Sequence, residues 1–141
     1  MTTNGVYDVL TVAHVRLLKK AKTEGDVLVV LLNSDDSVKR YKGEKRPINQ
    51  QEHRAEVIAN LDSVDYVLVF PQDTPLEYLG EIKPNVHVKG GTYIKERVEK
   101  EENLLKDFGG RVQLFELEEG LSTTITIETI LDKYLNNPSR D

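Results

Sequence analysis

The chain has 141 residues, 38% of them hydrophobic and 30% charged, with a formal net charge of −5. These values predict one compact soluble domain, and the acidic balance excludes an overall basic field that would attract nucleic acid. Cysteine is absent, which excludes disulfides and cysteine nucleophiles and fits a cytoplasmic location. The longest apolar run, residues 27–32, is too short to cross a membrane, and the first residues lack the regions of a signal peptide.

In the first half of the chain, short β-branched runs alternate with segments of helical periodicity. The first strand has almost no residues before Asn4 although its place in the order is central. We therefore expect it to be very short, or the natural chain to start further upstream. The pattern predicts, in chain order, a strand ending at residues 4–5, a helix running to residue 23, a buried strand over 27–32, a short helix over 34–39, a polar basic loop over 41–47, a helix over 50–60 and a strand over 65–70.

The second half continues this alternation. Thr74 is expected to cap a short helix whose first residue is Pro75, and Ser122 to open the last helix. Ile127, Ile130, Leu131, Tyr134 and Leu135 then share one face of that helix. The remaining elements are predicted to be a strand over 85–89, a charged helix over 94–108 and a strand over 111–117.

Strands that alternate with helices through short connections predict a parallel sheet covered by helices on both sides. The expected fold is therefore α/β: a three-layer α/β/α sandwich, Rossmann-like, with a five-stranded parallel sheet in a single domain. We expect this domain to span residues 1–135 and a disordered tail to span residues 136–141. In such sheets ligands bind beyond the carboxyl ends of the strands, so residues just after strands are the candidates for a site.

The first candidate site joins the first strand to the first helix. Gly5 allows a tight turn and a close approach of the backbone to a ligand, and the following amides at the helix N-terminus suit a phosphate. His14 lies in the first helical turn, where it can donate a hydrogen bond to a phosphoryl oxygen. From spacing alone, a plain turn glycine and a histidine on a helix face remain an equal alternative.

Residues 5–14 resemble the signature of the cytidylyltransferase-like nucleotidyltransferase superfamily, Gly-x-Phe-Asp followed by His- or Thr-x-Gly-His. Tyr7 stands at the Phe, Thr11 at the first His or Thr, Ala13 at the Gly and His14 at the second His. The resemblance implies catalytic roles for Thr11 and His14, as hydrogen-bond donors to phosphoryl oxygens. It also implies a nucleotide-binding surface that consists of Gly5, Val6, Tyr7, Asp8 and Ala13.

A basic segment, residues 39–47, places five cations within nine residues of an acidic protein. Most charge runs are solvated loops, which is the alternative here. The family carries a Lys-Gly…Arg-Pro stretch at this place and an arginine in the next helix, and Lys42, Arg46 and Arg54 match it. The resemblance implies a mobile flap that closes over the triphosphate, with Lys42 taking part in catalysis and both arginines binding the nucleotide.

Two later turns also resemble one branch of the family, the heptose-phosphate adenylyltransferases of lipopolysaccharide core (ADP-heptose) biosynthesis. The first is a strand end with paired glycines, where Thr92 replaces the usual Asp. The second is a helix start with three hydroxyls, which suits an anion. The residues implied to bind nucleotide in these turns are Lys89, Gly90, Gly91 and Tyr93, and Ser122, Thr123 and Thr124.

This resemblance covers essentially the whole chain and implies that AMP is transferred from ATP to a sugar phosphate, with release of pyrophosphate. Mg²⁺ is then expected to be held by the nucleotide phosphates, and a homodimer is expected by analogy. Two alternatives stay open. One is transfer to FMN or glycerol 3-phosphate, and the other is a non-catalytic nucleotide-binding relative, for which Thr11 and Ala13 are the supporting departures.

The other two histidines are interpreted as structural or solvated. His53 faces out from a predicted helix, and His87 sits in a predicted strand. We find no spacing of histidines and carboxylates that suits a metal, so no metal-ligating residues are predicted.

Overall fold

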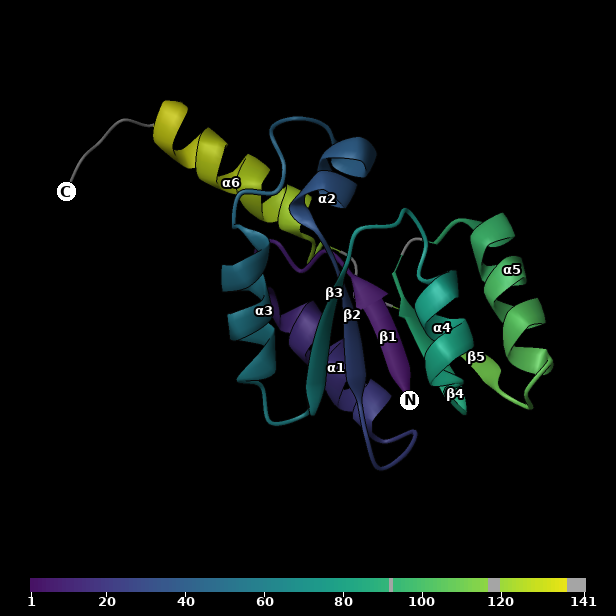
Figure 1. Ribbon diagram of the computed structural model, residues 1–141. Coiled ribbons are helices and arrows are strands. Elements are labelled where there is room, and N and C mark those ends of the chain that lie inside the picture. Colours follow the sequence, from purple (N-terminus) through teal and green to yellow (C-terminus); the bar gives the residue numbers. More distant parts are fainter. Residues whose placement is uncertain (92, 117–119, 137–141) are drawn as a thin grey trace.

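The computed structural model describes residues 1–91, 93–116 and 120–136. Its centre is one sheet of five parallel strands in the order β3-β2-β1-β4-β5 (Figure 1). This confirms the predicted parallel α/β fold. The strands are β1 (Thr2–Gly5), β2 (Val29–Asn33), β3 (Tyr66–Phe70), β4 (Val86–Gly90) and β5 (Arg111–Phe115).

Helices cover both faces of the sheet, as Figure 1 shows. On one face α1 (Val12–Lys22) and α3 (Gln51–Ala59) contribute to a core, and on the other α4 (Leu76–Ile82) and α5 (Lys95–Lys106) contribute to a second core. The remaining helices, α2 (Asp35–Lys42) and α6 (Thr123–Leu135), lie near the carboxyl ends of the strands. None of these helices, within the described part of the chain, combines the length and apolarity that a membrane span requires.

Strand β2 shows why its sequence is apolar without alternation. Val30 and Leu32 belong to the core beneath α1 and α3, whereas Leu31 belongs to the core with Phe70 and Leu105. All five side chains are fully buried. Because successive residues of a strand point to opposite faces, a strand covered on both sides needs apolar residues at every position.

Most element boundaries differ from the prediction by one or two residues, and two of the differences have a clear local cause. Helix α2 continues through Tyr41 and Lys42, which were expected to lie in a loop, and it ends at Gly43, whose φ of 96° suits glycine. Helix α4 begins at Leu76, so that Pro75 occupies the N-cap position instead of the first turn. Lys42 is therefore held at the end of a helix rather than on a free loop.

The packing of the last helix, α6, differs from that of the other helices, each of which has buried residues. None of the residues of α6 is buried, and the side chains of Ile130 and Tyr134 are 51% and 76% exposed. Its apolar face therefore lies outside both cores. The predicted tail lies outside the described residues except for Asn136, and so does the predicted end of the fifth strand at Leu117.

The strand order places the topological switch point of the sheet between β1 and β4. From β1 the chain builds β2 and β3 on one side, then crosses to build β4 and β5 on the other side. The connections that leave β1 and β4 therefore diverge and open a crevice at the carboxyl ends of these strands. The residues that follow Gly5 and Lys89 border this crevice.

Candidate active site

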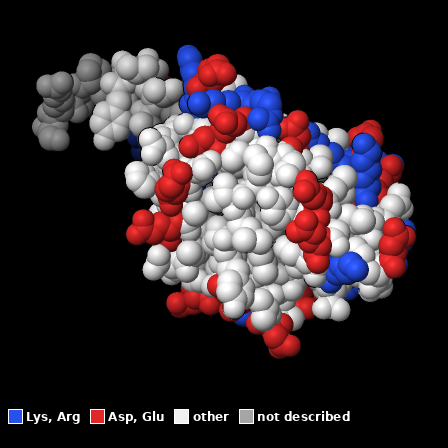
Figure 2. Space-filling view, in the orientation of Figure 1, with Lys and Arg blue, Asp and Glu red and all other residues white. Residues whose placement is uncertain are grey.

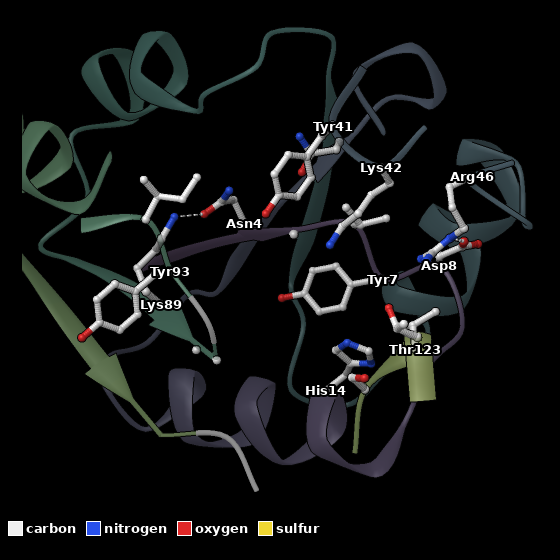
Figure 3. Close-up of a pocket in the computed structure, with 18 of the residues that line it drawn as sticks. Asn4, Tyr7, Asp8, His14, Tyr41, Lys42, Arg46, Lys89, Tyr93 and Thr123 are labelled. Atoms are coloured by element: carbon white, nitrogen blue, oxygen red, sulfur yellow. Dashed lines mark hydrogen bonds and ion pairs between the residues drawn. The ribbon is translucent and has the colours of Figure 1, made fainter. Parts of the chain in front are cut away.

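An open cavity of about 1020 Å³ lies at this switch point (Figure 3). It is walled by the loop after β1, the end of α2, the turn after β4, the start of α5 and the start of α6. These segments are far apart in the sequence, yet they bring together most of the predicted site residues. Those that line the cavity are Gly5, Val6, Tyr7, Asp8, His14, Lys42, Arg46, Lys89, Gly90, Gly91, Tyr93, Ser122, Thr123 and Thr124.

Gly5 and Tyr7 shape the floor of the cavity, but Gly5 differs from its predicted role. A Cβ atom at Gly5 would lie 2.8 Å from the ring of Tyr7, so the glycine makes room for that ring. The left-handed backbone falls instead on Tyr7, with a φ of 48°. Tyr7 packs edge-on against the ring of His14 at a centroid distance of 5.4 Å, and burial raises its pKa to about 12.

His14 has one defined neutral tautomer in this arrangement. The backbone N–H of Thr11 donates to Nδ1 of His14 at 3.0 Å, so Nδ1 is an acceptor and the ring proton belongs on Nε2. Burial lowers the pKa of His14, which keeps the ring neutral near pH 7. The residue therefore offers a single oriented N–H donor at the N-terminal end of α1, where the helix dipole also favours an anion.

Thr11 and Ala13 lie outside the cavity wall, unlike their motif neighbours. The hydroxyl of Thr11, which was expected to contact a phosphate, lies 3.5 Å from the carbonyl oxygen of Leu121 and 3.2 Å from Nδ1 of His14. Ala13 is 2% exposed and belongs to the buried side of α1. Thr11, at the N-cap, turns its hydroxyl toward His14 and the carbonyl oxygen of Leu121, and Ala13, one residue before His14, points to the buried side of α1.

Asp8 ties the loop after β1 to the basic segment. Its carboxylate accepts hydrogen bonds from Nε of Arg46 at 2.6 Å and from the backbone amides of Ile48 and Asn49, each at 2.8 Å. Burial alone would raise the pKa of Asp8, but the amides of Asn49 and Ile48 and the side chain of Arg46 outweigh it and hold the pKa low. Although Asp8 borders the cavity, its oxygens are occupied by the protein.

Arg54, predicted to bind nucleotide, lies outside the cavity wall. Its side chain is fully buried and donates to the carbonyl oxygens of Val6 and Asn49 at 2.7 and 2.9 Å, and to Asp35 at 2.9 Å. A buried guanidinium needs such partners because an unpaired charge is costly to bury. Arg54 therefore braces the loop after β1 from below.

Two helices that border the cavity bring basic side chains to the same aromatic ring. Lys42 stands over the ring of Tyr41 with its Nζ 4.6 Å from the centroid, and Arg97 of α5 approaches the same ring at 5.5 Å. These contacts connect the end of α2 with α5 across the cavity. Arg46 borders the cavity but is half of the ion pair with Asp8, so the segment that carries it is anchored at that point.

The turn after β4 needs its glycines for two different reasons. A Cβ atom at Gly90 would lie 2.6 Å from the side chain of Leu17, so this glycine lets α1 pack against the strand. Gly91 has a φ of 78°, which favours glycine over other residues. The prediction for Thr92, and those for residues 117–119, fall outside the described residues.

The start of α6 closes one end of the cavity. The hydroxyl of Ser122 accepts a hydrogen bond from the amide of Ile125 at 3.2 Å and caps the helix, as expected for the residue that opens it. Thr123 donates to the carbonyl oxygen of Val9 at 2.8 Å and ties α6 to the loop after β1. Both hydroxyls thus position the helix N-terminus, whose amides and dipole suit an anion.

Several cavity residues were not predicted. Asn33 had a usable signal, because it is a polar residue at the carboxyl end of a buried parallel strand. Arg97 had none, since it is one of many charged residues on α5. The residues added by the structure are Asn4, Asn33, Ser37, Arg40, Tyr41, Asp73, Ile94, Arg97, Val98, Glu116, Gly120, Leu121 and Ile125.

The histidines outside the cavity have the environments that the sequence indicated. His53 is exposed on α3, and His87 is fully buried in β4. Over residues 1–91, 93–116 and 120–136, no group of three His, Asp or Glu side chains is arranged to hold a metal ion.

A parallel sheet with a cavity at its switch point, in which two helix N-termini, an oriented histidine and basic side chains converge, is the arrangement of an α/β domain that binds a phosphorylated ligand. The chain belongs to the cytidylyltransferase-like family, whose profile matches residues 2–129. It is 49% identical over 132 residues to the bifunctional protein HldE of Pelobacter propionicus and 50% identical over 132 residues to that of Geobacter metallireducens. Each match covers 94% of this chain and 27% of the relative, so the chain spans about a quarter of these proteins.

Solved structures show the same fold. The lipopolysaccharide core biosynthesis protein of Thermoplasma volcanium matches with a TM-score of 0.67 and 26% identity, over 83% of this chain and 93% of that one. Pantoate-β-alanine ligase of Francisella tularensis matches with a TM-score of 0.61 and 18% identity, over 99% of this chain and 71% of that one. The second similarity extends to the fold alone.

Proposed function

We propose that this protein transfers AMP from ATP to a phosphorylated sugar, of the heptose 1-phosphate type, and releases pyrophosphate. The observation that carries the proposal is the orientation of His14. With Nδ1 occupied by the amide of Thr11, the ring presents Nε2–H to the cavity as a fixed donor. A donor that is already oriented stabilises charge on a phosphoryl oxygen without reorganising during the reaction.

The reaction needs no general base and no covalent intermediate with the enzyme. A phosphate oxygen of the acceptor attacks the α-phosphorus of ATP, the bond from that phosphorus to the bridging β-phosphate oxygen breaks, and pyrophosphate leaves with the electron pair. Because the acceptor oxygen is already anionic, the protein has to position the two substrates and stabilise charge. A neutral His14 suits this role better than a proton acceptor would.

The leaving pyrophosphate is assigned to the side of the cavity that carries Lys42, Arg46 and the start of α6. Figure 3 shows these residues beside Thr123, with His14 adjacent. The flexible ammonium of Lys42 and the guanidinium of Arg46, which Asp8 holds in place, suit phosphate oxygens, and the amides of the α6 N-terminus add to them. Ser122, Thr123 and Thr124 belong to this end, mainly because they shape the helix N-terminus.

Mg²⁺ is proposed to arrive with the nucleotide. Asp8 is a carboxylate that borders the cavity, and its oxygens are occupied by Arg46, Ile48 and Asn49. The described residues thus offer no carboxylate cage, and phosphate oxygens and water are the ligands that Mg²⁺ commonly keeps. The ion would neutralise phosphate charge.

The choice of a sugar phosphate as the acceptor rests on resemblance to known proteins. The turns at residues 89–93 and 120–124 resemble the heptose-phosphate adenylyltransferase branch, and one structural relative is a lipopolysaccharide core biosynthesis protein. The cavity of about 1020 Å³ is at the upper end for ligand sites, which supports two substrates bound together. ATP and sugar phosphates are cytoplasmic metabolites, and we place the reaction in the cytoplasm.

A homodimer is proposed as the functional form. Figure 2 shows an area without charged side chains on the face that carries β2 and β3. Tyr66 and Leu68 of β3 are 63% and 41% exposed on this face, and β3 is an edge strand of the sheet. Apolar patches and free strand edges of this kind favour association, and analytical ultracentrifugation tests it directly.

The function is tested by pyrophosphate release from ATP in the presence of Mg²⁺ and a panel of acceptors. We expect turnover with heptose 1-phosphate, weaker turnover with hexose 1-phosphates, and a large preference for ATP over CTP. Turnover with FMN alone, or with CTP and glycerol 3-phosphate, would replace the proposed acceptor. Tight ATP binding without pyrophosphate release from any acceptor would show a non-catalytic binder, for which Thr11→His provides a test of restored activity.

A further inference from the structure

A row of polar side chains crosses the buried sheet face between β1 and β4. Thr2 of β1 pairs in register with His87 of β4, and two residues further along each strand come Asn4 and Lys89. Since alternate residues of a strand share a face, these four side chains lie on the same side of the sheet. Glu101 reaches this row from α5, and the row ends at the cavity, which Asn4 and Lys89 line.

The row is joined by hydrogen bonds along its length. Lys89 Nζ donates to Glu101 at 2.9 Å and to Asn4 Oδ1 at 2.8 Å, and Nδ1 of His87 lies 2.8 Å from the hydroxyl of Thr2. Among the described residues, Oε2 of Glu101 and Nε2 of His87 have no hydrogen-bond partner and lie 3.9 Å apart. His87 thus faces the carboxylate as a buried neutral ring.

Lys89 is therefore an ammonium fixed at the edge of the cavity. Its side chain is 14% exposed, and two of its three N–H groups are taken by Glu101 and Asn4. The third N–H remains for a ligand. A buried ion pair is costly to desolvate, and here that cost has been met before any ligand arrives. A pre-ordered cation of this kind suits the phosphate of a ligand.

The position of Lys89 indicates which phosphate it takes. In an in-line displacement, the attacking oxygen and the leaving group lie on opposite sides of the phosphorus. Figure 3 shows Tyr7 and His14 between Lys89 on one side and Arg46 and Thr123 on the other. With the pyrophosphate held near Arg46 and the α-phosphate at His14, the attacking phosphate comes from the side of Lys89.

We infer that Lys89 anchors the phosphate of the acceptor rather than the nucleotide, and that Glu101 is the positioning residue that holds it. This assignment rests on the proposed function and deepens it. Arg97 lies one helical turn before Glu101 on α5 and also lines the cavity, so a second cation stands on the same helix face. The acceptor is thus a phosphomonoester of a small polar molecule that fits between α5 and the turn after β4.

The decisive variant is the double substitution Lys89→Gln with Glu101→Gln. It removes both charges, keeps hydrogen-bonding groups of similar length and leaves no buried charge unpaired, which protects folding. We expect the KM for heptose 1-phosphate to rise roughly tenfold or more, while the KM for ATP stays within about twofold. Lys89→Gln alone should raise the acceptor KM further, because the unpaired Glu101 carboxylate then repels the phosphate, and adding Glu101→Gln should restore part of the loss.

Glu101→Gln alone tests the positioning role, with Glu99→Gln as its control. Glu99 lies on the same helix in an exposed pair with Lys95, so its substitution should change neither KM. Glu101→Gln should lower kcat/KM for the acceptor roughly fivefold at an unchanged KM for ATP. Tighter acceptor binding in this variant would show that Glu101 acts through charge alone and would overturn the positioning role.

The failure of this inference is distinct from a failure of the proposed function. If the wild type releases no pyrophosphate with any acceptor, the function fails. Calorimetry of heptose 1-phosphate with the wild type and the double variant then still measures whether Lys89 anchors a phosphate. If the wild type turns over and the double variant raises the KM for ATP as much as that for the acceptor, Lys89 belongs to the nucleotide and the inference is overturned.

Discussion

Two buried carboxylates on opposite sides of the cavity, Asp8 and Glu101, are held in different ways. Both are nearly inaccessible, at 3% and 2% exposed. Both oxygens of Asp8 accept hydrogen bonds, chiefly from backbone amides. Glu101 accepts one bond, from the flexible side chain of Lys89, and its second oxygen has no partner among the described residues.

Asp8 is fixed mainly by backbone amides, whereas Glu101 is paired with a side chain. Backbone amides are fixed by the fold, so Asp8 and likewise His14, which accepts from the amide of Thr11, are oriented by the main chain. The pair of Lys89 and Glu101, in contrast, is held by contacts between side chains. We conclude that the main chain holds the side of Asp8, whereas on the side of Glu101 a network of side chains holds the Lys89 ammonium ready for an anion.

The largest effect is expected from Asp8→Asn, which removes the carboxylate that ties the loop after β1 to the basic segment. The amide cannot accept from Ile48, Asn49 and Arg46 together, and the guanidinium loses its counter-charge. The free energy of unfolding should fall by about 3 kcal/mol, as when one partner of a buried ion pair is removed. Urea denaturation measures it, with Asp73→Asn as the control, since Asp73 pairs with Arg40 at an exposed site and should cost less than about 1 kcal/mol. Equal losses of unfolding free energy in the two variants would show that Asp8 does not stabilise the loop after β1.

The dependence of the unfolding free energy on acidic pH provides a second test of the Asp8→Asn variant. Because the pKa of Asp8 is lowered on folding, its contribution is present above the ordinary carboxyl pKa and is lost as the pH falls through the lower, folded value. The wild type should therefore lose stability in the range below about pH 4, and Asp8→Asn should lose less over that range. Parallel pH profiles of the two proteins would contradict this.

The next largest effect is expected on turnover from His14→Ala. Removal of the oriented Nε2–H donor should reduce kcat by roughly a hundredfold with little change in ATP affinity, which corresponds to about 2.7 kcal/mol of transition-state stabilisation. His53→Ala, at an exposed position on α3, is the control and should leave kcat unchanged. A matched loss of ATP affinity in His14→Ala would make this histidine a binding residue instead.

The same comparison explains how far the sequence predicted the site. The fold followed from periodicity, because strands such as β2, buried on both faces, leave an unmistakable apolar run. Most motif residues of the loop after β1 line the cavity. The contacts of Gly5 with Tyr7, and of Arg54 with Val6, Asn49 and Asp35, could not be predicted, because a local pattern does not reveal tertiary contacts.

The burial of Glu101 beside Lys89 could not be predicted from the sequence, for a related reason. Its sequence signal is one acidic residue within a helix that is charged throughout, and only packing shows that Glu101 is buried beside Lys89. The shared apolar face of α6 was predicted, but an amphipathic pattern does not say what covers it, and in the structure none of its residues is buried. Local pattern thus predicts elements and turn residues, whereas the partners of buried polar groups come from tertiary structure.

The smallest effect is expected from Thr11→Val, which sharpens the distinction between main-chain and side-chain support. Sequence reasoning gave the Thr11 hydroxyl a phosphate contact, but the structure turns it toward Leu121 and His14. The bond that orients His14 comes from the backbone N–H of Thr11, which valine retains. Turnover should therefore fall by less than about threefold, with the pH profile unchanged. A loss comparable to that of His14→Ala would show that the hydroxyl itself acts on the substrate, and the main-chain account of this side of the cavity would then be wrong.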